Sequence, residues 1–137
     1  MNKDKLDTKP KVLIVEDELE SQKYFELVLK KKFRVDFCDT KRSMYDLLSK
    51  KNYDAIVMDI SLKDGVNGLD LIKELKRSTS NINIPIICLS AHTFSEDRLK
   101  AEEAGADIYL TKPTKRQILI NAIDELIAIS LDEKKSA

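Results

Sequence analysis

The residues best suited to chemistry stand directly after short apolar segments of the chain. Glu16 and Asp17 follow residues 12–15, and Asp59 follows residues 55–58. If both segments are strands of one parallel sheet, their carboxyl ends share an edge and the three carboxylates lie close together. Two carboxylates about 4 Å apart repel by about 4 kcal/mol at an effective dielectric constant of about 20, so a cation or a proton must lie between them. Oxygen ligands without histidine or cysteine are typical of Mg²⁺, with Mn²⁺ as the alternative.

Two further polar residues follow later apolar segments. Ser90 comes after residues 84–89, and Lys112 comes shortly after residues 108–110. A hydroxyl group and an ammonium group are therefore expected beside the three carboxylates. This set describes a phosphoryl site in which Asp59 is the nucleophile, Lys112 and the cation neutralise the phosphoryl oxygens, and the Ser90 hydroxyl donates a hydrogen bond.

The elements that must position these residues alternate between strands and helices. Short aliphatic runs predict strands at 12–15, 33–38, 55–58, 84–89 and 108–110. Apolar residues at helical spacing predict helices at 19–32, 41–50, 69–76 and 115–129. A charge-rich segment that ends at Gly105 predicts a further, mostly solvated helix at 95–104. The alternation predicts an α/β fold with a doubly wound, five-stranded parallel sheet covered by helices on both faces, in a three-layer sandwich.

Length and charge indicate one domain without a general affinity for polyanions. The 137 residues predict a single domain at 11–130, between a polar arm at 1–10 and a polar tail at 131–137. Lys plus Arg and Asp plus Glu number 24 each, so the formal net charge is zero and no attraction to nucleic acid or anionic lipid is expected. Neither a membrane helix nor a signal peptide is recognisable, which favours a cytoplasmic protein with no membrane partner. Cys38 and Cys88 lie in apolar segments and are expected to be reduced, buried and structural.

The combination of Glu16–Asp17, Asp59, Ser90 and Lys112–Pro113 carries a resemblance to a known family. The chain resembles the receiver domain of two-component response regulators, in a single-domain form like the chemotaxis regulators, over residues 11–129. The resemblance implies a flavodoxin-like fold with five strands and five helices. It also implies that a histidine kinase or a histidine phosphotransfer protein phosphorylates an aspartate, and that the phosphorylated form acts on a downstream protein effector.

The resemblance assigns a role to each matching residue. Asp17 is expected to bind Mg²⁺ directly, Glu16 through water, and Ser61 through its backbone carbonyl, beside the phosphoacceptor Asp59. Ser90 and Tyr109 are then the switch hydroxyl and the switch aromatic, and the Lys112–Pro113 peptide bond is expected to be cis. Ser61 and His92 flank the expected path of the hydrolytic water and would tune the lifetime of the phosphorylated form.

The chain departs from the family pattern at two places. The loop after Asp59 is one residue longer than the commonest form and has Lys63 where proline is frequent. Thr114 stands where the family usually has phenylalanine. Neither change removes a chemical group from the site.

The final predicted helix has apolar residues beyond its inward face. Ile118, Ala122 and Ile129 extend that face and, with Tyr109, predict an output surface over the fourth helix, the fifth strand and the fifth helix. A kinase, an effector or a second copy of the chain, as a homodimer, is expected to dock there.

Several other classes of protein share parts of this residue pattern. A haloacid-dehalogenase-type phosphatase needs a second aspartate two residues after the nucleophile, where this chain has Ser61. A Rossmann domain needs G-x-G-x-x-G after the first strand, where this chain is acidic. A receiver fragment of a larger hybrid kinase or multidomain regulator, and an interaction module independent of phosphorylation, stay open. Asp17 could also be a helix cap, Tyr109 a core residue and His92 a solvated loop residue. We expect a switch that catalyses only its own phosphorylation and dephosphorylation, not an enzyme with a separate substrate.

Overall fold

The computed structural model describes residues 8–62, 67–81, 83–91 and 95–136. Its centre is one parallel sheet in the order β2-β1-β3-β4-β5. The strands are β1 (Lys11–Val15), β2 (Arg34–Cys38), β3 (Ala55–Asp59), β4 (Ile86–Ser90) and β5 (Ile108–Thr111). The predicted five-stranded, doubly wound α/β fold is therefore confirmed.

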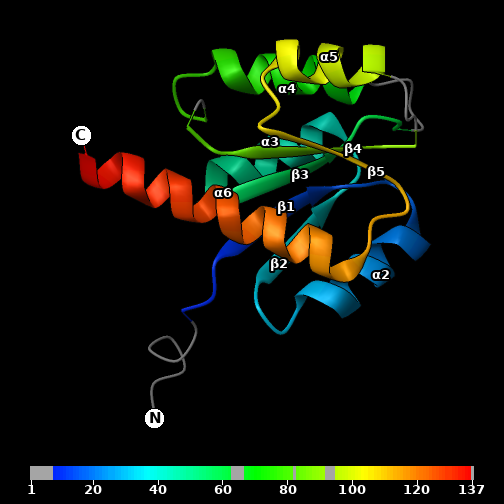
Figure 1. The fold of residues 1–137 in the computed structure, drawn as a ribbon, viewed down its shortest axis with the longest axis horizontal. Helices are drawn as coiled ribbons and strands as arrows, with labels where there is room; N and C mark the ends of the chain where they lie inside the picture. The colour runs from blue at the N-terminus through cyan, green and yellow to red at the C-terminus, as the bar shows by residue number, and fades with distance from the viewer. Residues whose placement is uncertain (1–7, 63–66, 82, 92–94, 137) are drawn as a thin grey trace.

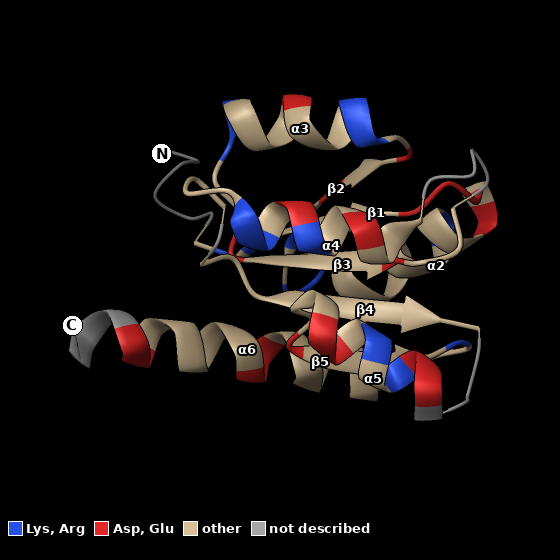
Figure 2. Cartoon of the chain, turned by 90° about the horizontal axis from the view of Figure 1, so that it is seen from above, with Lys and Arg blue, Asp and Glu red and all other residues tan. Residues whose placement is uncertain are grey.

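Five helices cover the two faces of the sheet, as Figure 1 shows. They are α2 (Leu19–Leu29), α3 (Lys41–Lys50), α4 (Gly68–Arg77), α5 (Ser95–Ala104) and α6 (Arg116–Ser136). Core residues of α3, α4 and α5 pack with one face of the sheet, and those of α2 and α6 pack with the other. Basic and acidic residues are interspersed along α4 and α5 (Figure 2), in keeping with the zero net charge of the chain.

The three central strands explain why the sheet is buried on both faces. Every residue of β3 and β4 is buried, and only Lys11 in β1 is not. Their side chains alternate between the two cores: Leu13 and Val15 join one, and Val12 and Ile14 join the other. Strands that are apolar at every position are typical of a parallel sheet between two helical layers.

The strand order places a crevice at one edge of the sheet. From the central β1 the chain first turns outward to β2 and then returns past β1 to β3, β4 and β5. The two directions of winding diverge between β1 and β3, at their carboxyl ends. Open α/β sheets bind ligands at such a switch point, and Glu16, Asp17 and Asp59 lie there.

Two helix ends differ from the sequence prediction. The last helix continues to Ser136, so the expectation of a polar tail outside the helix after residue 130 is wrong for residues 131–136. This segment is rich in aspartate, glutamate and lysine, a composition that is also typical of a solvated tail. Glutamate and lysine nevertheless have high helix propensity. The predicted helix at 19–32 ends earlier, at Leu29, because the amides of Lys32 and Phe33 both donate to the Leu29 carbonyl and turn the chain into β2.

Other element boundaries shift by one or two residues. Gly68, expected in the loop before the third helix, is the first residue of α4. Strand β4 begins at Ile86, two residues later than predicted, directly after Pro85. The carbonyl of Pro85 still accepts a hydrogen bond from the Ile56 amide of β3. Among the described residues, no helix combines the length and apolar character needed to cross a membrane.

Candidate functional site

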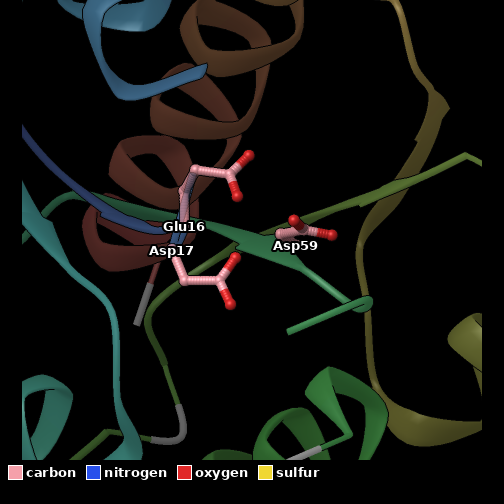
Figure 3. Close-up of side chains that lie close together, drawn as sticks. All are labelled: Glu16, Asp17 and Asp59. Atoms are coloured by element: carbon pink, nitrogen blue, oxygen red, sulfur yellow. The ribbon is translucent and has the colours of Figure 1, made fainter. Parts of the chain in front are cut away.

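Three carboxylates meet at the carboxyl ends of β1 and β3. Each of Glu16, Asp17 and Asp59 offers an oxygen that lies within 4.8 Å of the other two. Glu16 and Asp59 are buried, whereas Asp17 is partly exposed. Figure 3 shows the two side chains that follow β1 and the one that ends β3 arranged around a common space. The convergence predicted from the strand ends is therefore observed.

Lys112 completes the charge arrangement. Its Nζ lies 2.8 Å from Glu16 Oε1 and 3.0 Å from Asp59 Oδ2, so one ammonium group bridges the ends of β1 and β3. With all four groups ionised, the cluster has a formal charge of −3 + 1 = −2. A divalent cation would neutralise that charge.

Burial and charge pairing together shift the pKa values of Glu16 and Lys112. Burial raises the pKa of the Glu16 carboxyl; the Lys112 ammonium opposes this shift, and the neighbouring Asp59 carboxylate adds to it. Burial alone would lower the pKa of Lys112, but the hydrogen bonds to Glu16 and Asp59 outweigh it, and the pKa is raised. The two carboxylates therefore favour the protonated form of Lys112, and the Lys112 ammonium favours the charged form of Glu16.

The donor set suits a hard divalent cation. All three acidic groups offer carboxylate oxygens, and two of them are already oriented by hydrogen bonds. Magnesium typically takes one or two protein carboxylates and keeps several waters. The partly exposed Asp17 is the member of the cluster with access to such waters.

The segment after Asp59 is fixed by backbone contacts. The Ser61 amide donates to Asp59 Oδ1 at 2.9 Å, so both oxygens of this carboxylate accept hydrogen bonds, one from Ser61 and one from Lys112. Gly68 packs directly on this turn, because a Cβ at Gly68 would lie 2.6 Å from the Asp59 carbonyl oxygen. Close approach of the backbone of α4 thus holds the exposed Ser61 beside the carboxylate.

The ends of β4 and β5 supply the remaining groups. Asp59 is paired with Leu89, and Ser90, which is fully buried, follows at the same edge of the sheet. The Ser90 carbonyl accepts a hydrogen bond from the Lys112 amide at 2.7 Å. The Lys112–Pro113 peptide bond is cis, as the family resemblance implied.

The comparisons with known proteins agree with this geometry. A family model described as "Response regulator receiver domain" matches residues 12–124. This chain belongs to the response regulator receiver domain family. The receiver domain is 41% identical over 104 residues to the transcriptional regulatory protein CusR of Escherichia coli K12, covering 75% of this chain and 44% of CusR. It is 32% identical over 127 residues to the cell cycle transcriptional regulator CtrA of Caulobacter vibrioides, covering 92% of this chain and 54% of CtrA. It thus spans about half the length of these curated relatives.

Solved structures show the same receiver fold. One is the receiver domain of the sensor histidine kinase PA1611 from Pseudomonas aeruginosa PAO1, with a magnesium ion coordinated in its active site cleft. It has a TM-score of 0.79 at 29% identity, covering 88% of this chain and 99% of that one. Another is a response regulator from Chloroflexus aurantiacus, with a TM-score of 0.83 at 27% identity, covering 88% and 99%.

The three residues of α6 that were predicted to extend the output surface differ in exposure. Ile118 and Ile129 are 49% and 46% exposed, but Ala122 is only 7% exposed, so the prediction that it faces a partner is wrong. Ala122 lies three residues after Leu119 and four before Leu126, and these positions share the inward stripe of α6. His92 lies outside the described residues.

Tyr109, the predicted switch aromatic, is buried. Tyr109 packs in the core beneath α5, and the Arg98 guanidinium carbon lies 5.5 Å from the centre of its ring. This contact was not predicted from the sequence. No spacing rule connects Arg98 with a residue on the following strand.

Two residues of α2 that contact the site were also missed. The Tyr24 hydroxyl donates to the Thr114 carbonyl at 2.9 Å, so α2 is tied to the turn after Pro113. The Thr114 hydroxyl donates to the Thr111 carbonyl, which anchors the turn where the family usually has phenylalanine. Gln22 Nε2 donates to the Glu16 carbonyl at 2.6 Å. The only feature of the sequence that could have indicated this contact is the position of Gln22 one helical turn inside α2.

Proposed function

We propose that this receiver domain is a phosphorylation-dependent signalling switch. It accepts a phosphoryl group from a histidine kinase or a histidine phosphotransfer protein onto Asp59, in a reaction that requires Mg²⁺, and then changes its output surface. The observation that carries this proposal is the buried Asp59 carboxylate, held between Ser61 and Lys112 beside two further carboxylates. Members of this family are signalling switches and not enzymes that turn over a separate substrate.

The transfer step follows from the contacts of Asp59. A carboxylate oxygen of Asp59 forms a bond to phosphorus, the phosphorus–nitrogen bond of phosphohistidine breaks, and its electron pair returns to the imidazole. Lys112 is placed to neutralise a phosphoryl oxygen, since its Nζ lies 3.0 Å from Asp59 Oδ2. A bound Mg²⁺, held by Asp17 and Asp59, by Glu16 through water and by the Ser61 carbonyl, would supply further charge neutralisation.

The switch would act through Ser90 and Tyr109. A hydrogen bond from the Ser90 hydroxyl to the phosphoryl group would favour one arrangement of the ends of β4 and β5, where Lys112 and Ser90 already share a backbone hydrogen bond. Tyr109 and the exposed Ile118 and Ile129 would then present an altered surface to an effector or to a second copy of the chain. Ser61 and His92 would tune how fast the phosphoryl group is hydrolysed.

The alternative that this receiver domain is part of a larger hybrid kinase or multidomain regulator is supported by one of its relatives. The chain is 32% identical over 135 residues to the hybrid signal transduction histidine kinase I of Dictyostelium discoideum, covering 93% of this chain and 8% of that protein. A receiver within a hybrid kinase or a multidomain regulator would carry out the same chemistry at Asp59 and pass the signal to a different partner.

Incubation with a small phosphodonor tests the proposal. The parent should gain the mass of one phosphoryl group in the presence of Mg²⁺ and lose it on treatment with hydroxylamine. Asp59→Asn should gain none, and chelation of Mg²⁺ should prevent labelling of the parent. Equal labelling of the parent and of Asp59→Asn would refute the assignment of Asp59.

A further inference from the structure

The peptide group between Glu16 and Asp17 connects two carboxylates of the site. Gln22 reaches back from the second turn of α2 and donates a hydrogen bond from Nε2 to the Glu16 carbonyl at 2.6 Å. The residue at the start of α2, Glu18, makes no capping hydrogen bond with its side chain. The Gln22 amide is therefore a direct tie between α2 and the turn that carries the acidic pair.

This hydrogen bond constrains a part of the turn that other contacts of Glu16 do not. The Glu16 amide donates to the Cys38 carbonyl, and the Glu16 carboxylate accepts from Lys112 and from the Glu18 amide. Those bonds fix the residue and its side chain. Because a peptide group is planar, holding the Glu16 carbonyl also sets the direction in which the chain enters Asp17.

We propose that Gln22 is a positioning residue for the divalent cation site. It holds the Glu16–Asp17 peptide plane so that the partly exposed Asp17 carboxylate stays with Glu16 and Asp59, where one oxygen of each lies within 4.8 Å of the others. The inference rests on the proposed function, because it assumes that this cluster binds Mg²⁺. Outer groups that orient metal ligands commonly change metal affinity by about 10- to 100-fold.

Two substitutions separate positioning from electrostatics. Gln22→Met keeps the length and the helix propensity of the side chain but removes the donor. Gln22→Glu also removes the donor and adds a negative charge, which by itself would tighten binding of a cation. If Gln22 positions the turn, both variants should bind Mg²⁺ about tenfold more weakly than the parent. The matched control is Gln117→Met, because the Gln117 amide bonds only to Asn121, within α6, among its described contacts.

Mg²⁺ titration followed by the backbone amide resonance of Asp17 measures the effect. In the metal-free state this resonance should move in both Gln22 variants and stay in place in Gln117→Met, with urea midpoints close to that of the parent. If Gln22→Met binds Mg²⁺ as tightly as the parent, or Gln22→Glu binds it more tightly, the positioning role is refuted. If the parent itself does not bind Mg²⁺, the proposed function fails instead.

Discussion

Replacing Lys112 by methionine should destabilise the protein in a way that depends on pH. The substitution keeps most of the side-chain volume and removes the ammonium group that lies 2.8 Å from Glu16 and 3.0 Å from Asp59. Glu16 is fully buried and would be left as a charge without its cation. Removing one partner of a buried ion pair commonly costs about 3–5 kcal/mol. Since Lys112 is 23% exposed, we expect the lower end, about 3 kcal/mol of unfolding free energy at pH 7.5.

The pH dependence follows from Glu16. Its pKa is already raised by burial in the presence of Lys112, and loss of the ammonium group raises it further. A carboxyl whose pKa is higher in the folded state loses stability as the pH rises above its unfolded value of about 4.3, at up to about 1.4 kcal/mol per pH unit. At pH 5 the folded variant can keep Glu16 protonated, so the loss should shrink to about 1 kcal/mol.

Urea unfolding of the parent and of Lys112→Met at pH 5 and pH 7.5 measures these losses. Lys76→Met is the matched control, because Lys76 is 22% exposed but its carboxylate partner, Asp107, is 39% exposed. The control should lose less stability, with little change between the two pH values. Adding Mg²⁺ should stabilise Lys112→Met more than the parent, because the cation then has no ammonium group to compete with. A loss in Lys112→Met that is the same at both pH values would show that Glu16 does not depend on Lys112 for its charge.

Two further predictions concern groups outside the site. Burial raises the pKa of both Cys38 and Cys88 to about 12, so only about 10⁻⁴ of each thiol is ionised at pH 8. An aromatic disulfide reagent should therefore label them only as fast as the protein unfolds. Rapid labelling of the folded protein would contradict the burial of these thiols. Burial opposes a low pKa at Asp36, but hydrogen bonds from Tyr53 and Lys51 hold it below its ordinary value. Tyr53→Phe should therefore lower the free energy of unfolding by about 1 kcal/mol at pH 7, and by less as the pH falls through the folded-state pKa of Asp36. Urea unfolding at pH 7 and at about pH 3 measures this difference. An equal loss at the two pH values would indicate that lost packing is responsible.

Most of the fold could be predicted because its signal is local and repeated. Short, largely apolar strands alternate with helices along the chain, and few topologies accept that order. The ends of elements were harder to predict, since residues 30–32 and 131–136 are both rich in charged residues. The first segment turns toward β2 and the second continues a helix. The first helix ends at Leu29 because of the backbone hydrogen bonds that lead into β2, which composition does not reveal.

The acidic cluster could be predicted because parallel strands bring their ends to one edge. The residue types alone were sufficient to predict this site, since three carboxylates and a lysine that meet at one place indicate a charged binding site. Gln22 was missed because its partner is a backbone carbonyl, which every residue carries. Ala122 was misplaced, although its spacing from Leu119 and Leu126 puts it on the inward stripe of α6.

Locating the phosphoryl group by peptide mapping tests the central claim most directly. After incubation with a phosphodonor and Mg²⁺, borohydride reduction converts an aspartyl phosphate to the corresponding alcohol, which marks the residue permanently in the fragment mass spectrum. We predict a single modified residue, Asp59, whose yield falls on chelation of Mg²⁺. A mark on Asp17 or Glu16, or a phosphoryl group on a serine that resists reduction, would contradict the assignment of Asp59 as the acceptor.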